Sequence, residues 1–136
     1  MVSLALRPFP RFSVSRVETD RRGVSYTVET ARLLRRRHPG RELFFLIGAD
    51  TADHLRTWKR YRELLRLVHF AVITRPGVAL RGLPRGGRFT ILRTRGLPFS
   101  SRAIRRRLAR GTTAAPGLPP AVARYIRARG LYREGK

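Results

Sequence analysis

Short apolar runs alternate along this chain with segments whose apolar residues recur every three or four positions. The runs at residues 43–47, 70–74 and 89–92 have the length of strands. The first run is uninterrupted, which is typical of a strand buried on both sides. The imperfect alternation from Phe12 to Val17 predicts one more short strand. Strands that alternate with helices indicate an α/β fold, a Rossmann-like parallel sheet with helices on both faces.

Helical periodicity and turn residues place the helices between these strands. Ser25 or Thr27 is expected to cap a helix that ends at Pro39 and Gly40. Ser100 or Ser101 is expected to cap a later helix. Glycine, proline and arginine mark residues 78–88 as a loop. The pattern predicts helices at residues 2–6, from the Ser25/Thr27 cap to about 38, at 60–68, from Ser100 onward, and at 120–129.

Composition narrows the class of protein. The 136 residues are enough for one domain, expected at residues 1–132 with a short tail at 133–136. A hydrophobic content of 42% argues against disorder, and the lack of cysteine excludes disulfides and thiolate metal sites. No apolar stretch approaches the roughly 18 residues of a membrane span, and no secretory signal pattern is present. The cytoplasm is therefore the expected compartment.

Arginine supplies nearly all of the positive charge, and the net charge is +23. Lys59 and Lys136 are the chain's lysines, and the arginines are spread along the chain rather than concentrated in one block. Such a distribution predicts non-specific affinity for polyanions. It leaves nucleotide and nucleic acid both open as partners.

A glycine and an aspartate follow the first apolar run, where ligands bind in a parallel sheet. Gly48 lets a ligand approach the backbone closely, and Asp50 can accept hydrogen bonds from ribose hydroxyls. The alternative is structural: a turn that ends the strand, with Asp50 as a helix cap.

Two serines open a basic amphipathic helix further along the chain. The free N–H groups at its start, the hydroxyls of Ser100 and Ser101, and Arg105 form a candidate phosphate site. Arg107 is expected to be solvated. The alternative interpretation is a capped surface helix with a basic, solvent-exposed face.

Taken in order, these motifs resemble the bacterial nicotinate-nucleotide adenylyltransferases, a branch of the HxGH nucleotidyltransferase superfamily. The resemblance extends from about residue 2 to residue 132. Its motifs are Ser25-Tyr-Thr-Val-Glu-Thr30, Phe45-Leu-Ile-Gly-Ala-Asp50, Thr57-Trp-Lys59, Arg75-Pro-Gly77, Ser100-Ser-Arg-Ala-Ile-Arg105 and the closing segment Leu118 to Tyr132.

The resemblance implies a reaction in which AMP passes from Mg-ATP to nicotinate mononucleotide and pyrophosphate is released, a step of NAD biosynthesis. Mg²⁺ would enter with ATP rather than on protein ligands, so no metal-binding residue is expected. The implied ATP-binding residues are Gly48, Asp50, Ser100, Ser101 and Arg105, and those for nicotinate mononucleotide are Thr27, Trp58 and Arg75. Trp58, the chain's single tryptophan, is alternatively a core anchor.

The chain departs from the family pattern in two places. Arg102 stands where the serine signature has threonine, and the opening strand with its His-x-Gly-His pair has no counterpart. The histidines are His38, His54 and His69, none in that motif, so no catalytic residue is assigned. The fold is therefore expected to be N-terminally truncated and the chain inactive in transfer.

Two explanations for the missing motif are open. One is a misplaced start or a disrupted reading frame, and the other is a genuine short protein that binds nucleotide. A further alternative, from a different class, is an arginine-rich nucleic-acid-binding protein on the same scaffold.

Overall fold

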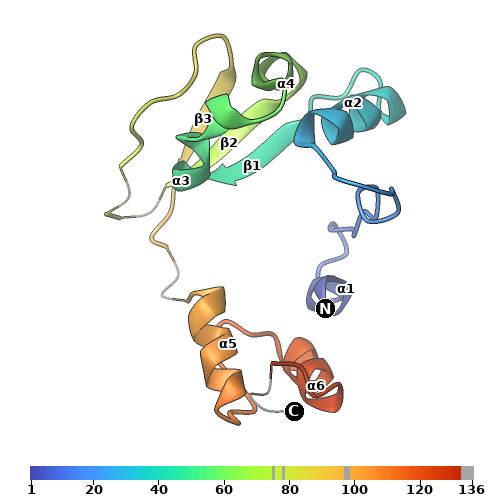
Figure 1. Ribbon diagram of the computed structural model, residues 1–136, viewed down its shortest axis with the longest axis vertical. Coiled ribbons are helices and arrows are strands. Elements are labelled where there is room, and N and C mark those ends of the chain that lie inside the picture. The colour runs from blue at the N-terminus through green and yellow to red at the C-terminus, as the bar shows by residue number, and fades with distance from the viewer. Residues whose placement is uncertain (75, 78, 97–98, 133–136) are drawn as a thin grey trace. The chain divides into compact units, whose positions relative to one another are not determined.

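The computed structural model describes residues 1–74, 76, 77, 79–96 and 99–132. These residues form two compact units, each described by itself. One, called the sheet unit, is Arg16–Gly96, and the other, called the helical unit, combines Met1–Ser15 with the chain from residue 97 onward. Figure 1 shows the elements of both units.

Three parallel strands form the centre of the sheet unit, and this arrangement confirms the predicted parallel α/β fold (Figure 1). The order in the sheet is β1-β2-β3. Two short elements and a helix connect β1 to β2, as a parallel connection requires. The strands are β1 (Phe44–Gly48), β2 (His69–Thr74) and β3 (Arg88–Arg93), and the connecting elements are α3 (Ala49–Ala52), η1 (Leu55–Thr57) and α4 (Tyr61–Leu67).

One face of the sheet carries the core of the unit. Phe45, Phe70 and Phe89 lie in register across the three strands. The ring of Phe70 lies 6.0 Å from that of Phe45 and 5.3 Å from that of Phe89, measured between centroids. Helices α2 (Thr27–Arg37) and α4 add their apolar sides to the same buried cluster through Val28, Ala31, Leu64 and Leu65. Burial of each large apolar side chain stabilises the fold by roughly 1.5–3 kcal/mol.

The opposite face of the sheet is exposed along β1. Phe44 is 55% exposed and Leu46 is 60% exposed, so the prediction that this strand is buried on both sides is wrong. The buried residues of α2, α3 and α4 belong to the cluster on the covered face. An apolar run specifies side chains suited to burial on both faces, but it does not specify which element covers each face.

Two local predictions are also wrong. Residues 12–16 form no strand, and Phe12 is 65% exposed, because none of the described strands pairs with this segment. Neither Ser25 nor Thr27 caps α2, because the cap position is Tyr26, which makes no side-chain capping hydrogen bond, and Thr27 is the first residue of the helix. The Ser25 hydroxyl donates instead to the carbonyl oxygen of Glu18, 3.3 Å away. The Ser25 side chain thus bonds to a backbone group outside the helix and does not cap α2.

The helical unit packs three short helices around a small apolar cluster. The predicted starts of its last two helices are confirmed, and Pro120 occupies the first turn of α6, where a missing N–H costs nothing. Among the described helices, none combines the length and apolar content needed to cross a lipid bilayer. The helices are α1 (Val2–Leu6), α5 (Ser101–Ala109) and α6 (Pro120–Ala128), and the cluster contains Leu108, Val122 and Ile126 with Leu4, Ile104 and Leu118 against it.

Candidate functional site

The turn after β1 holds a carboxylate directly beside a glycine. Gly48 is the last residue of β1 and precedes the first residue of α3. A Cβ at position 48 would lie 2.5 Å from Oδ1 of Asp50, so a side chain there would displace the carboxylate. The same Oδ1 accepts a hydrogen bond from the backbone N–H of Thr51 at 3.0 Å. Asp50 is exposed, and its carboxylate can accept hydrogen bonds from hydroxyl groups of a ligand.

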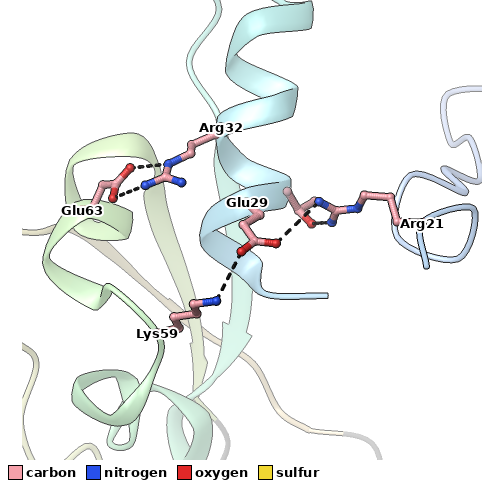
Figure 2. A network of polar contacts seen from close by, with 6 residues as sticks. Arg21, Glu29, Arg32, Lys59 and Glu63 are labelled. Atoms are coloured by element: carbon pink, nitrogen blue, oxygen red, sulfur yellow. Dashed lines mark hydrogen bonds and ion pairs between the residues drawn. The ribbon is translucent and has the colours of Figure 1, made fainter. Parts of the chain in front are cut away.

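The start of α2 and the segment before α4 lie together in the sheet unit, and Lys59 joins them. Its Nζ lies 3.6 Å from the centroid of the Tyr26 ring. The same Nζ lies 3.5 Å from Oε1 of Glu29, a contact shown in Figure 2. Thr27 follows Tyr26 in the chain, and Trp58 precedes Lys59. The structure therefore brings together the chain segments that carry Thr27 and Trp58, two of the three residues expected to line the nicotinate-nucleotide pocket.

Trp58 also contributes to the core. Its ring packs edge-on against Phe45 of β1, with 6.0 Å between the centroids, and the residue is half-buried. This contact supports its interpretation as a core anchor. It also connects the Trp58 segment with the strand that ends at Gly48.

Further polar contacts hold α2 in place on both sides (Figure 2). Arg21 approaches Glu29 at 3.9 Å and donates to the Thr30 hydroxyl at 2.8 Å. On the other side, Arg32 donates two hydrogen bonds to the carboxylate of Glu63 on α4. These hydrogen bonds hold the pKa of Glu63 below its ordinary value and raise that of Arg32, because each charge stabilises the other.

Lys59 and Glu29 are not among the residues that the sequence motifs indicate as parts of a site. The two residues lie 30 positions apart, and neither occurs in a local pattern that specifies contact with the other. The signal that was available is their position within two motifs, beside Thr27 and beside Trp58. Arg75, the third residue expected at the nicotinate-nucleotide pocket, lies outside the described residues.

The serine motif belongs to the helical unit. Ser100 caps α5, and its Oγ accepts a hydrogen bond from the N–H of Ala103 at 3.1 Å, as predicted. Ser101 and Arg105 are exposed and stand four positions apart, on one side of the helix. A hollow of about 120 Å³ beside the helix start is lined by Ser100 and Arg107, whereas Arg105 does not line it. Arg107, expected in solvent, is exposed but also borders this hollow.

The histidines occupy structural positions. His38 ends α2, and His54 precedes η1. His69 stacks on Phe44 with 4.7 Å between the ring centroids, and its Nε2 lies 2.8 Å from the Thr90 hydroxyl. Within the described part of the chain, no three side chains of histidine, cysteine, aspartate or glutamate are grouped so as to hold a metal ion.

The parallel α/β fold and the comparison with known families place this protein in the class of α/β nucleotidyltransferases. The chain belongs to the cytidylyltransferase-like family, which matches residues 1–107, and within it to the nicotinate-nucleotide adenylyltransferases. The resemblance inferred from the motifs is thus confirmed.

Relatives and solved structures carry the same family name. The probable nicotinate-nucleotide adenylyltransferase of Streptomyces coelicolor is 44% identical over 126 residues, which cover 91% of this chain and 66% of that protein. The corresponding protein of Frankia alni is 42% identical, with 98% of this chain and 71% of that protein covered. The chain therefore spans about two thirds of the length of these relatives.

The fold is similar to that of the Plasmodium falciparum nicotinic acid mononucleotide adenylyltransferase complexed with APC. The TM-score is 0.63 at 19% identity, with 82% of this chain and 60% of that chain covered. The same enzyme complexed with NaAD also gives a TM-score of 0.63 at 19% identity, with 80% of this chain and 58% of that chain covered. At this level of identity the similarity concerns the fold.

Replacement of Glu63 by Gln is expected to lower the free energy of unfolding at neutral pH, because Arg32 then loses its carboxylate partner. The folded-state pKa of Glu63 is lowered, so the stabilisation is present above the unfolded value of about 4.3. It is lost as the pH falls through the folded-state pKa, and the difference between wild type and Glu63→Gln should then disappear. Urea unfolding followed by Trp58 fluorescence from neutral pH to about pH 3 measures this difference.

The matched control is Asp20→Asn, which removes a carboxylate from an exposed ion pair with Arg16 and should change stability little. A stability difference between wild type and Glu63→Gln that stays constant down to acid pH would contradict the assignment.

Proposed function

We propose that this chain binds ATP and nicotinate mononucleotide as a nicotinate-nucleotide adenylyltransferase of NAD biosynthesis. In that reaction AMP passes from Mg-ATP to the mononucleotide, and pyrophosphate is released. The observation that carries the proposal is the contact of Lys59 with Tyr26 and Glu29, which joins the chain segments that contain Thr27 and Trp58. The names of the relatives support it, as do the two Plasmodium structures, which are complexes with APC and with NaAD.

In the sheet unit, we assign the adenosine ribose to the turn after β1. The exposed carboxylate of Asp50 would accept hydrogen bonds from the ribose hydroxyls, and Gly48 leaves the backbone open to the nucleotide. The Trp58 indole would pack against the nicotinate ring. Thr27 belongs to this proposed pocket, and Arg75 is assigned to the same substrate from its motif alone.

The phosphates of ATP are assigned to the start of α5. Its free N–H groups, the hydroxyls of Ser100 and Ser101, and the Arg105 guanidinium are donors suited to phosphate oxygens. Ser100 keeps its O–H as a donor although its oxygen already caps the helix. Mg²⁺ bound to ATP would neutralise part of the phosphate charge, so this chain needs no metal ligand set of its own.

Loss of the Arg105 guanidinium is expected to weaken ATP binding by about tenfold, since a charge-assisted hydrogen bond contributes roughly 1.5–3 kcal/mol. Calorimetric titration of ATP into wild type and Arg105→Ala measures the change. Arg110→Ala is the matched control, because it removes the same charge at the other end of α5. Equal losses in both variants would show diffuse electrostatic attraction and would remove the phosphate assignment.

The 136-residue polypeptide is expected to bind its substrates without completing the transfer. Its sequence contains no His-x-Gly-His, the motif whose imidazoles stabilise the transferring phosphate in the family that it resembles. Release of pyrophosphate from ATP and nicotinate mononucleotide should therefore not exceed the rate measured without protein. Substantial turnover by this polypeptide would contradict the prediction.

A specific observation favours a second candidate function, the binding of single-stranded nucleic acid. A groove of about 450 Å³ in the sheet unit is lined by Tyr61, Leu65 and four arginines, with no carboxylate among its lining residues. Within the described part of the chain, none of these arginines takes part in an ion pair. A basic groove with an aromatic ring is typical of surfaces that bind single strands. The arginines are Arg56, Arg62, Arg66 and Arg85.

The salt dependence of binding separates the two candidates. Affinity for a single-stranded oligonucleotide should fall steeply with salt, because each neutralised phosphate releases counterions. Affinity for ATP should fall much less, since hydrogen bonds and backbone N–H groups contribute more of it. Fluorescence anisotropy across a series of salt concentrations measures both slopes, and equal slopes would contradict the distinction between the two sites.

A further inference from the structure

We infer that Lys59 is a positioning residue of the nicotinate-nucleotide pocket, where its ammonium group holds the start of α2 against the segment that carries Trp58. This inference rests on the proposed function. It adds a residue that the motif comparison did not assign. Lys59 is not required to touch the substrate, because it would act through Tyr26, Glu29 and the residues beside them.

The ammonium group of Lys59 makes two contacts. The ammonium lies 3.6 Å from the centroid of the Tyr26 ring, well within the roughly 6 Å over which a cation is attracted to an aromatic face. The same ammonium lies 3.5 Å from Oε1 of Glu29. Tyr26 is the residue before α2, and Glu29 lies in its first turn. One cation therefore restrains both sides of Thr27.

The start of α2 depends on such outside contacts. Tyr26 provides no side-chain cap, so the helix has no capping hydrogen bond of its own to fix its first turn. Arg21 approaches Glu29 from one side and Lys59 approaches it from the other (Figure 2). Lys59 directly follows Trp58 in the chain. Removal of Lys59 removes the polar contact of the first turn with the segment before α4, and it leaves the contacts with Arg21 and the burial of Val28.

Other contacts hold α2 in place independently of Lys59. Arg32 pairs with Glu63 of α4, and Val28 and Ala31 are buried in the core of the sheet unit. Lys59 and Glu29 are themselves 43% and 37% exposed, and an isolated pair at such exposure stabilises a fold very little. Loss of Lys59 should therefore loosen the pocket locally and leave global stability nearly unchanged.

The single tryptophan gives a direct readout of this effect in the ligand-free protein. In Lys59→Met, which keeps a long stem but removes the charge, acrylamide should quench Trp58 fluorescence more strongly than in wild type. Lys59→Arg restores the cation and should restore the wild-type quenching. Arg36→Met is the matched control, because it removes an equal charge from an exposed position of α2. Unchanged quenching in Lys59→Met would overturn the inference.

Ligand titrations then test the pocket itself. Quenching of Trp58 by nicotinate mononucleotide should show an affinity about tenfold lower in Lys59→Met, close to wild type in Lys59→Arg, and unchanged in Arg36→Met. ATP affinity and the urea midpoint should match wild type in all three variants. Glu29→Gln should weaken the binding of nicotinate mononucleotide as well. The double variant Lys59→Met/Glu29→Gln should lose less binding free energy than the sum of the two single losses, because both residues act through one contact.

The outcomes separate this inference from the proposed function. If wild type binds no nicotinate mononucleotide, the proposed function fails, and the inference fails with it. If wild type binds but Lys59→Met binds equally well, the inference alone fails. Equal losses of ATP and mononucleotide affinity, or a lowered urea midpoint in Lys59→Met, would show a general structural role and would also overturn it.

Discussion

The row of phenylalanine rings across the three strands is the interaction on which the sheet unit depends. Phe70 is fully buried between Phe45 and Phe89, and the two helices that cover the sheet pack on the same side of it. Because side chains alternate along a strand, burial of these rings fixes the register of all three strands. The register in turn fixes where β1 ends. The turn with Gly48 and Asp50 is therefore located by packing in the core.

Much of the fold follows from patterns in the sequence, because strand length and helical periodicity are local properties. The strands and helices of the sheet unit and the Ser100 cap are examples. The failures have a different origin. Residues 12–16 alternate weakly but are not part of the described three-stranded sheet, and Ser25 donates to the carbonyl oxygen of Glu18 instead of capping α2. In both cases the outcome depends on contacts that no local pattern contains.

The candidate site shows the same division. The order of the motifs indicates the residues beside the proposed pocket, because each motif is contiguous in the chain. The contacts of Lys59 with Tyr26 and Glu29 join motifs about 30 positions apart, and nothing near either motif specifies them. Trp58 illustrates why one role does not exclude another. It packs on Phe45 as a core anchor, and the same contact fixes the orientation in which a ligand would meet it.

The exposed side of β1 has a consequence for how the protein behaves in solution. Phe44 and Leu46 present an apolar surface on a strand at the edge of the described sheet, and such surfaces promote association between molecules. A net charge of +23 opposes this association through repulsion between like-charged molecules. Salt shortens the range of that repulsion to about 8 Å at physiological ionic strength but leaves the apolar attraction in place. The colloidal stability of this polypeptide therefore depends on ionic strength, and dilute buffers favour the monodisperse protein.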